Sequence, residues 1–284
     1  MKVDRPFGAL SIAVLWLWLL AFALVPNLMV IVASVLSRGQ EEFVAFAWTL
    51  DNYRRLADPL YLAVLGKSLY LAAASTLLCL LIGYPFAWLL AGLPPRRRPW
   101  LLLLVIIPFW TSSLIRTYAM VIILKTKGVV NQTLLGLGII DAPLDLLYTD
   151  AAVLLGLVYA LLPFMVLPLY AVMEKLDRRL IEAARDLGAR RRRIFLTVIL
   201  PLTLPGIVAG GMLTFLPALG MFYIPDVLGG AKSLLAGNLI RDQFLTARDW
   251  PFGAAVSVML TLLMGLLLGI YRLSARRARA EGLP

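Results

Sequence analysis

The 284-residue sequence contains no histidine, one cysteine and few charged residues. Without histidine, neither a Ser-His-Asp triad nor a Cys-His pair can form, and the commonest transition-metal ligand is missing. Cys79 lies alone in an apolar run, so no disulfide can form within the chain and a thiolate metal site is not expected. We therefore expect no catalytic residues, no metal ligands and no cofactor bound by this chain.

Charged residues make up 15% of the chain, whereas 61% of its residues are hydrophobic. A soluble domain is nearer half apolar and cannot bury so much hydrophobic surface. The composition therefore predicts an all-α, polytopic membrane protein.

Six apolar segments are long enough to cross a bilayer as helices, which takes about 20 residues. They are residues 10–36, 65–92, 100–123, 150–172, 203–224 and 252–271. The first is much longer than the apolar region of a signal peptide, and no convincing cleavage site ends it, so we expect it to be a retained span. We find no internal repeat and no low-complexity linker, and we expect one transmembrane domain over residues 1–284.

The basic residues are distributed unevenly between the two sets of connecting segments. With the N-terminus in the cytoplasm, the inner segments hold 17 of the 27 basic residues and six of the 16 acidic ones. These basic residues are Lys2, Arg5, Arg96, Arg97, Arg98, Lys175, Arg178, Arg179, Arg185, Arg190, Arg191, Arg192, Arg193, Arg272, Arg276, Arg277 and Arg279. The whole net charge of +11 thus lies on one side, which follows the positive-inside rule and is not a nucleic-acid footprint. We expect both termini to be cytoplasmic.

A charged segment, residues 173–199, separates the fourth and fifth predicted spans. Its sequence "EKLDRRLIEAARDLGARRRR" predicts a short amphipathic helix, because apolar residues recur at helical spacing between the charges. Gly188 follows the end of this apolar stripe, as a helix-ending glycine does. Taken alone, such a helix is typical of one that lies on anionic lipid. The stripe consists of Leu176, Leu180, Ala183, Ala184 and Leu187.

The spacing inside this segment is more specific than its amphipathicity. In chain order, the pattern is Glu-Ala-Ala followed by three residues and a glycine. After nine more residues come a branched apolar residue, one further residue and Leu-Pro. The matching residues are Glu182, Ala183, Ala184, Gly188, Val198, Leu200 and Pro201. The pattern resembles the signature loop of permease subunits of bacterial ABC importers, with Val198 where Ile is usual. The resemblance implies the type I importer permease fold and a coupling helix that these residues form or position, docked on an ATPase subunit.

ATP hydrolysis is not expected in this chain, which we interpret as a transport subunit rather than an enzyme. A P-loop requires G-x-x-x-x-G-K-[ST] after a strand. The sequence "GGAKS" at 229–233 lacks the Gly-Lys pair and lies in a predicted outer loop, so we interpret it as a turn. The resemblance implies that ATP and Mg²⁺ bind to the partner ATPase subunits.

The resemblance extends along nearly the whole chain to the first permease subunit of spermidine/putrescine importers (PotB-type). It includes "PFWTSSLIRTYAM" and "FYIPDVLGGAKSLLAGNLIRDQFLTARDWPFGAA", and therefore outer loops that general ABC permeases do not share. Putrescine-dedicated relatives typically have Gly-Glu-Phe where this chain has Gly220, Met221 and Phe222, which favours spermidine and leaves putrescine or another solute open. The resemblance implies a bacterial inner membrane, two ATPase subunits, a second homologous permease and a periplasmic polyamine-binding protein.

Four side chains would suit the passage of a polyamine, which is a flexible polycation. Aromatic faces offer cation–π contacts, and sparse carboxylates offer charge-assisted hydrogen bonds. The candidates are Trp110 near the middle of the third span, Tyr118 two turns outward, and Tyr223 and Asp226 at the outer end of the fifth span. The alternatives are that the aromatic residues are headgroup anchors and that Asp226 caps a turn.

Two basic residues near or within spans have a different interpretation. A charge such as Arg116 inside a span costs about 2.5–3.5 kcal/mol on insertion scales. Because arginine would repel a polycation, we interpret Arg116 as structural, and likewise Lys67 at the outer start of the second span. Asp242 and Asp249 are interpreted as loop or docking residues.

Three other classes of function remain open at this point. One is an ABC permease for another small solute, such as an amino-acid derivative, a phosphonate or a metal complex. A secondary transporter usually has internal repeats and buried ionisable residues near the midplane, neither of which is clear here. A membrane enzyme has little support, because no histidine and no clustered catalytic motif are present.

The first prediction concerns topology. A reporter that is active only in the periplasm, fused after Pro284, should stay inactive, because the positive-inside rule places both termini in the cytoplasm. Activity of that fusion would contradict the six-span count, and a fusion to a cytoplasmically active reporter provides the control.

Overall fold

The computed structural model describes residues 5–39, 43–230 and 233–280, most of them helical. Helices suit a membrane protein because they satisfy every backbone N–H and C=O group internally. The chain divides into two compact units, and helices α4, α12 and α13 each contribute to both. The first unit comprises residues 1–63 and 239–264, and the second comprises residues 64–238 and 265–284.

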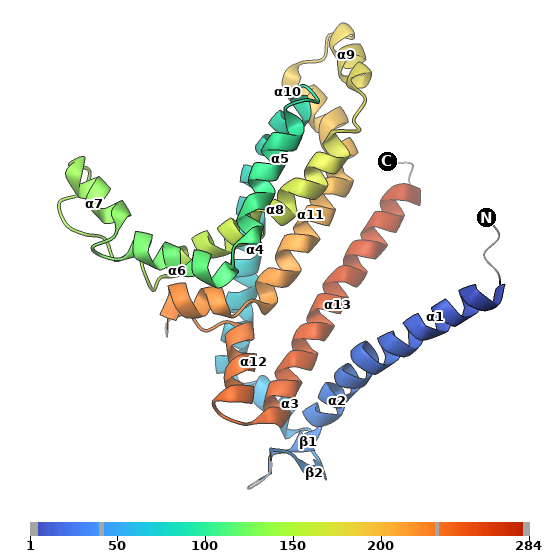
Figure 1. Cartoon of the computed structure of the whole chain (residues 1–284), viewed down its shortest axis with the longest axis vertical. Helices are drawn as coiled ribbons and strands as arrows, with labels where there is room; N and C mark the ends of the chain where they lie inside the picture. Colours follow the sequence, from blue (N-terminus) through green and yellow to red (C-terminus); the bar gives the residue numbers. More distant parts are fainter. Residues whose placement is uncertain (1–4, 40–42, 231–232, 281–284) are drawn as a thin grey trace. The chain divides into compact units, whose positions relative to one another are not determined.

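The first unit contains the N-terminal helices, a two-stranded sheet and the turn between the last two helices (Figure 1). The strands pair antiparallel, with Leu36 opposite Trp48. Its elements are α1 (Arg5–Leu19), the π-helix η1 (Leu20–Leu24), α2 (Val25–Ser34), β1 (Leu36–Ser37), β2 (Ala45–Trp48), α3 (Asp51–Leu56), most of α12 (Ala236–Leu245) and the first part of α13 (Trp250–Ala280).

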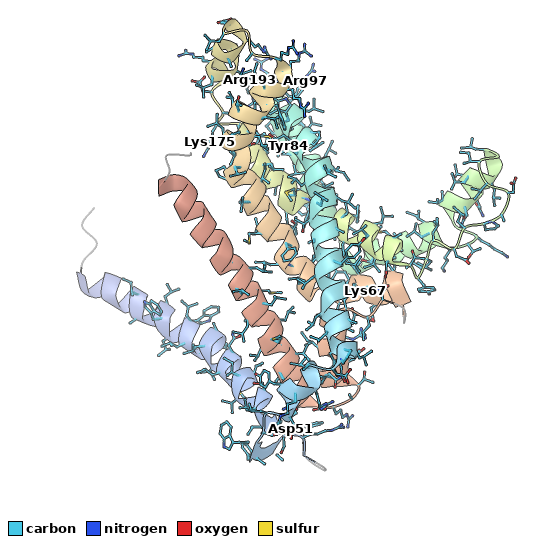
Figure 2. All side chains as sticks on the ribbon, turned by 180° about the vertical axis from the view of Figure 1, so that it is seen from behind. Asp51, Lys67, Tyr84, Arg97, Lys175 and Arg193 are labelled. Carbon is cyan, nitrogen blue, oxygen red and sulfur yellow. The ribbon has the colours of Figure 1, made fainter. Side chains whose placement is uncertain are left out.

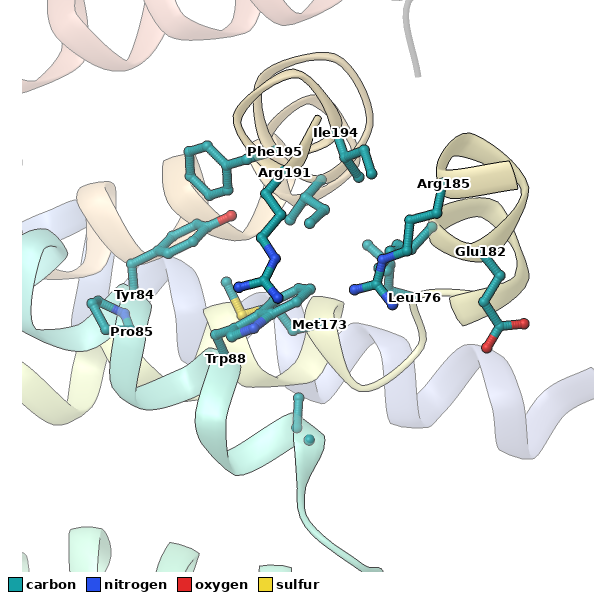
Figure 3. Close-up of a pocket in the computed structure, with 14 residues that line it drawn as sticks. Tyr84, Pro85, Trp88, Met173, Leu176, Glu182, Arg185, Arg191, Ile194 and Phe195 are labelled. Carbon is teal, nitrogen blue, oxygen red and sulfur yellow. The ribbon is translucent and has the colours of Figure 1, made fainter. Parts of the chain in front are cut away.

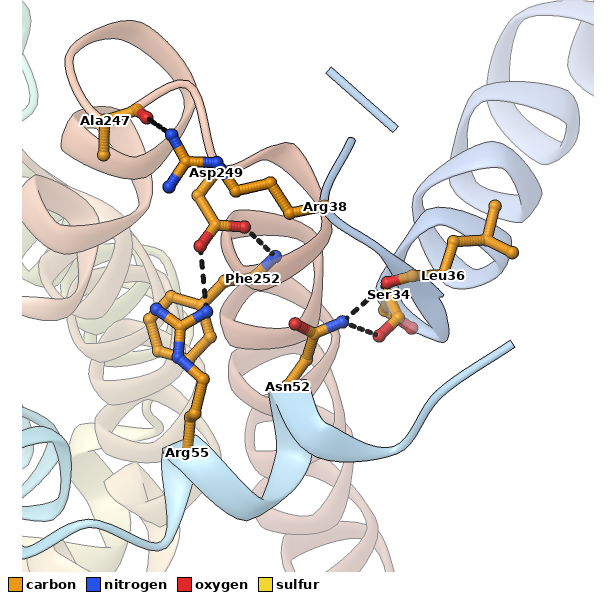
Figure 4. A network of polar contacts seen from close by, with 8 residues as sticks. All are labelled: Ser34, Leu36, Arg38, Asn52, Arg55, Ala247, Asp249 and Phe252. Atoms are coloured by element: carbon orange, nitrogen blue, oxygen red, sulfur yellow. Dashed lines mark hydrogen bonds and ion pairs between the residues drawn. The ribbon is translucent and has the colours of Figure 1, made fainter. Parts of the chain in front are cut away.

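An ion pair between the exposed Arg55 and the buried Asp249 links α3 to the α12–α13 turn (Figure 4). Asp249 is only 2% exposed, and its carboxylate accepts a hydrogen bond of 2.9 Å from the Arg55 guanidinium. The same guanidinium lies over the Phe252 ring, 4.1 Å from its centroid. Because a buried carboxylate is costly without partners, this pairing explains how an acid can lie at the start of an apolar helix.

Side chains also fix the chain around the small sheet. The Asn52 side-chain amide donates hydrogen bonds to the carbonyls of Ser34 and Leu36, at 3.1 and 2.9 Å. Arg38 donates to the carbonyl of Ala247 at 2.8 Å (Figure 4). These bonds hold the end of α2, the sheet, α3 and the α12–α13 turn together within the first unit.

The second unit is built around the adjacent helices α8 and α11, which lie side by side (Figure 1). Short helices connect and flank them. Its elements are most of α4 (Pro59–Gly92), α5 (Arg98–Ile106), the 3₁₀-helix η2 (Ile107–Trp110), α6 (Ser113–Leu124), α7 (Val129–Gly136), α8 (Asp150–Met173), α9 (Arg178–Asp186), α10 (Arg191–Ile194), the π-helix η3 (Phe195–Ile199), α11 (Leu200–Gly220) and the π-helix η4 (Pro225–Gly229).

The contact between α8 and α11 depends on Gly210. A Cβ atom at that position would lie 2.7 Å from the Met165 sulfur and 3.0 Å from the Met165 carbonyl oxygen. Met165 itself is completely buried, together with Leu161 and Leu169 on the same helix. Small residues allow this close approach of helix backbones in membranes, where packing rather than water exclusion holds helices together.

Five of the six predicted spans are confirmed as long apolar helices. They are Ile12–Ser34, Pro59–Gly92, Asp150–Met173, Arg191–Gly220 and Trp250–Gly269.

The third predicted span, residues 100–123, is not one straight helix. It consists of Arg98–Trp110 and Ser113–Gly136, which are bent by 91° at the break. Thr111 has an extended backbone and Ser112 a non-helical one, and Pro108 lies in the 3₁₀ turn just before them. Proline removes a helical hydrogen bond, which favours a break here. The count is six only if this bent pair forms one span.

Basic residues from two of the predicted inner segments, those after the second and the fourth predicted spans, lie at one end of the second unit. Arg97, Lys175 and Arg193 lie at that end, whereas Lys67 lies toward the opposite end (Figure 2). Segments that the sequence assigned to a common side of the membrane therefore share one end of the helices.

The second prediction tests the α8–α11 contact. Gly210→Ala should lower the free energy of unfolding by about 1–3 kcal/mol, because the added methyl group overpacks Met165. Gly211→Ala is the matched control, since its Cβ would have only the Thr76 methyl group nearby, at 4.0 Å. Thermal denaturation of the detergent-purified chain measures the difference, and equal melting temperatures for the two variants would contradict the close contact.

Candidate functional site

The predicted coupling helix is α9, Arg178–Asp186, and both of its ends are capped. Asp177 is the N-cap, and its carboxylate accepts a hydrogen bond of 3.0 Å from the backbone N–H of Arg179. At the other end Gly188 has a φ of +77°, and its N–H donates to the Arg185 carbonyl at 2.8 Å. The N–H of Ala189 donates to the Ala184 carbonyl at 3.1 Å, which completes a Schellman motif. The glycine is required by this left-handed turn.

The apolar residues of α9 form two faces rather than the single stripe that the sequence predicted. Ile181 is buried with Ile194 and Ile199, and Leu176 and Ala184 pack against this cluster. A second set of apolar side chains points away from this cluster, and no other element of the described part of the second unit buries them. This exposed face consists of Leu180, Ala183 and Leu187, and Leu187 is 88% exposed. We call these three residues the exposed face of α9.

The predicted coupling residues occupy three different environments. Glu182 and Ala183 are exposed on α9, and Ala184 is half-buried against the isoleucine cluster. Leu200 and Pro201 are half-buried at the first turn of α11, directly after the π-helix η3. The signature pattern therefore combines residues that a partner can reach with residues that connect the loop to the span behind it.

Polar contacts hold the base of the coupling loop. Arg98 on α5 donates a hydrogen bond of 3.0 Å to Glu174, in the connection between α8 and α9. A hydrogen bond from the Tyr170 hydroxyl, and after it the one from Arg98, lowers the pKa of the Glu174 carboxyl. The Tyr84 hydroxyl lies 2.9 Å from that of Thr203, which joins α4 to α11. The segment between α8 and α11 is thus attached at its start to α5 and at its end to α4.

A cavity of about 680 Å³ lies beside α9, and we call it the α9 pocket. Apolar and aromatic side chains from α4, α8, α10 and η3 form most of its wall, and three charged side chains also line it, of which Arg185 and Arg191 point inward (Figure 3). The principal lining residues are Tyr84, Trp88, Met173, Glu182, Arg185, Arg191 and Phe195.

The predicted pathway residues lie at the bend of the third span and after α11. Trp110 is the last residue of η2, directly at the bend, and is 78% exposed. The expectation that Tyr118 lies two turns further along the same helix is wrong, because the 91° bend separates α6, which holds Tyr118, from Trp110. Non-helical Thr111 and Ser112 are the physical cause, since they end the helix that holds Trp110.

Asp226 and Tyr223 follow the break that ends α11. Met221 has an extended backbone, and Asp226 lies in η4, which packs against α6 and α8. The Asn238 side chain donates hydrogen bonds to the Phe222 carbonyl at 2.8 Å and to the Asp226 carboxylate at 3.3 Å. Tyr118 on α6 and Asp226 on η4 therefore lie on two elements that contact each other. The Asp226 carboxylate is exposed and accepts a hydrogen bond from Asn238.

Arg116 and Lys67 have different surroundings, and among the described residues the buried Nε of Arg116 has no hydrogen-bond partner. The Arg116 guanidinium lies between two rings, 5.5 Å from the Phe109 centroid and 5.7 Å from that of Tyr159. Lys67 forms an ion pair of 2.8 Å with Asp150. Asp242 pairs with its neighbour Arg241 at 2.6 Å.

Sequence reasoning missed two polar groups that connect segments distant in the sequence, Asn238 and the Asp249–Arg55 pair. Asp249 lies in a loop, one of the two roles expected for it, but the sequence did not indicate that it is buried and paired with Arg55. No single-residue signal identifies such partners, because 194 residues separate them along the chain. Within residues 5–39, 43–230 and 233–280, no group of three or more Cys, Asp or Glu side chains could hold a metal ion.

Comparison with known proteins defines the class. The family model "binding-protein-dependent transport system inner membrane component" matches residues 83–280. The chain belongs to this family, whose members are inner-membrane permeases of binding-protein-dependent ABC importers and work with an ATPase and a periplasmic binding protein.

Individual relatives extend the match beyond that segment. The chain is 57% identical over 259 residues (91% of the chain, 94% of the relative) to the "Spermidine/putrescine transport system permease protein PotB" of Escherichia coli strain K12. It is 55% identical over 276 residues (97% and 96%) to the protein of the same name from Salmonella typhimurium strain SL1344. A chain in the crystal structure of a bacterial alginate ABC transporter shares the fold, with a TM-score of 0.78, 17% identity and coverage of 96% and 95%.

The third prediction separates the shape of the coupling helix from its contacts. Gly188→Val should weaken co-purification of the ATPase, because a β-branched residue in the left-handed conformation costs about 1–2 kcal/mol or opens the turn. Gly188→Asn should retain most of it, since asparagine tolerates this conformation. Glu182→Arg should weaken co-purification without disturbing the turn.

Membrane levels of each variant provide the control for this experiment. Normal ATPase association and transport in both Gly188→Val and Glu182→Arg would favour the alternative that α9 only lies on the lipid surface.

Proposed function

We propose that this chain is the permease subunit of a polyamine importer and forms half of the translocation pathway, with spermidine as the preferred substrate. The observation that carries the proposal is the similarity to permeases named for spermidine and putrescine transport, which covers 91–97% of the chain. It therefore includes the outer segments with Tyr223 and Asp226. The absence of a carboxylate at Met221 supports spermidine over putrescine.

The proposed assembly contains a second, homologous permease, two ATPase subunits and a periplasmic polyamine-binding protein. ATP and Mg²⁺ would bind only to the ATPase subunits. The exposed face of α9 and Glu182 support this arrangement, because apolar side chains left uncovered beside a directional carboxylate suit a protein groove. We also propose that both termini and α9 are cytoplasmic, in keeping with the basic residues at one end of the second unit.

The geometry suggests how a polycation would pass. Asp226 offers an exposed carboxylate whose position Asn238 fixes, and Tyr223 and Tyr118 lie on neighbouring elements. Trp110 presents its ring at the bend of the third span and is mostly exposed there. A charge-assisted hydrogen bond is about twice as strong as a neutral one, and a cation–π contact contributes roughly 0.5–2 kcal/mol, so these groups would guide the substrate without trapping it.

The fourth prediction tests these residues. Asp226→Asn and Trp110→Leu should each reduce spermidine uptake about fivefold, equivalent to roughly 1 kcal/mol of lost attraction for a cation. Uptake is measured in cells with equal membrane levels of each variant. Asp145→Asn and Trp100→Leu are the matched controls, because they remove an exposed carboxylate and an exposed indole outside the proposed path. Normal uptake by both pathway variants would leave Asp226 a turn residue and Trp110 a lipid anchor.

The reconstituted importer tests the substrate itself. ATP hydrolysis should rise when the binding protein is loaded with spermidine, and not with a phosphonate, an amino-acid derivative or a metal complex. Stimulation by one of those solutes instead would replace the polyamine proposal, and transport without any ATPase would indicate a secondary transporter.

A further inference from the structure

The α9 pocket has an unusual combination of charge and apolar surface. Arg185 and Arg191 direct their guanidinium groups into it, whereas Glu182 turns its carboxylate away (Figure 3). Within the part of the chain that the structure describes, neither guanidinium forms an ion pair or a hydrogen bond. Two cations thus lie together without an anion between them, although Glu182 is close along the helix.

The rest of the pocket wall favours a ligand with a large apolar part. Trp88, Met173 and Phe195 contribute apolar surface, and the Phe195 ring packs edge-on against Tyr84 at 5.8 Å. A volume of about 680 Å³ is in the range of small-molecule sites and exceeds what a bare phosphate ion would fill. A compact, fully hydrated anion would leave these rings without a partner.

The position of the pocket matches the depth of lipid headgroups. It lies where α4 and α8 end, at Gly92 and Met173, and these are the ends of two of the apolar spans. Tryptophan and tyrosine favour this depth, and basic pockets between transmembrane helices bind anionic headgroups. The placement at the inner leaflet rests on the proposed function, which makes α9 cytoplasmic.

We propose that the α9 pocket binds one anionic phospholipid, with its phosphate between Arg185 and Arg191 and its acyl chains against Trp88 and Phe195. Arg185 belongs to α9, Arg191 to α10 and Trp88 to α4, so one lipid would connect the coupling helix to the second span. The lipid would occupy the side of α9 that faces the spans and leave the exposed face of α9 open to the ATPase.

The fifth prediction uses the complete importer in phosphatidylcholine nanodiscs that contain increasing fractions of phosphatidylglycerol with brominated acyl chains. Bromine quenches nearby indoles, and the Trp88 signal is the difference between the importer and its Trp88→Phe variant. We expect saturable quenching of Trp88. The combined substitution of Arg185→Gln and Arg191→Gln should raise the half-saturating fraction at least tenfold, because it removes both charge-assisted contacts to the lipid phosphate.

Two combined variants make this test specific. Arg192→Gln with Arg193→Gln removes the same charge from exposed residues outside the pocket, and should leave the half-saturating fraction within about twofold. Arg185→Lys with Arg191→Lys keeps the positive charge and should retain lipid binding. Equal weakening in the two glutamine variants would mean diffuse attraction to the membrane and would overturn the proposal.

Two further outcomes would also overturn it. Displacement of the brominated lipid by millimolar inorganic phosphate would identify a soluble phosphate compound as the ligand. Quenching of Trp88 in the separate permease but not in the complete importer would show that another protein chain fills the pocket. The measurement needs neither polyamine nor ATP, so its failure is distinguishable from a failure of the proposed transport function.

Discussion

Gly210 brings the backbone of α11 against Met165 of α8 at a distance that leaves no space for a methyl group. The chain between these two helices holds the predicted coupling loop, residues 173–199, with α9, α10 and η3 at residues 178–199. Packed interiors move as blocks and deform little. A partner that pulls on α9 would therefore move α8 and α11 together, and not one helix past the other.

The same helix pair also positions the proposed pathway residues. The π-helix η4 follows α11 and packs against α8, so Asp226 is attached to the pair that carries the coupling loop. At its N-terminal end α8 begins with Asp150, whose carboxylate binds Lys67 on α4 and the Ser233 hydroxyl. Displacement of α8 would thus reach α4, η4 and the segment after it. This gives a physical route from the coupling loop to Asp226 within a single unit.

The sequence predicts features that depend on composition and misses those that depend on long-range partners. Apolar length predicted five spans, and the glycine after α9 predicted its Schellman end, because both are local properties. The bend at Thr111 could not be predicted from an apolar run that continues on both sides of it. The apolar stripe of α9 was misjudged because Ile181 and Leu180 are adjacent in sequence, and only the buried Ile194 and Ile199 show which of them faces inward.

Burial of Ile181 also determines which face of α9 stays exposed. Once that side chain packs against the isoleucine cluster, Leu180, Ala183 and Leu187 must face the opposite way, since a helix turns about 100° per residue. Arg185 then lies beside the α9 pocket on the Ile181 side of the helix, because four residues advance the helix by about 40° beyond one full turn. One side of α9 thus packs against the isoleucine cluster, and the other side stays exposed within the second unit. Charged residues fill the positions between them, so the helix can contact protein, lipid and water at once.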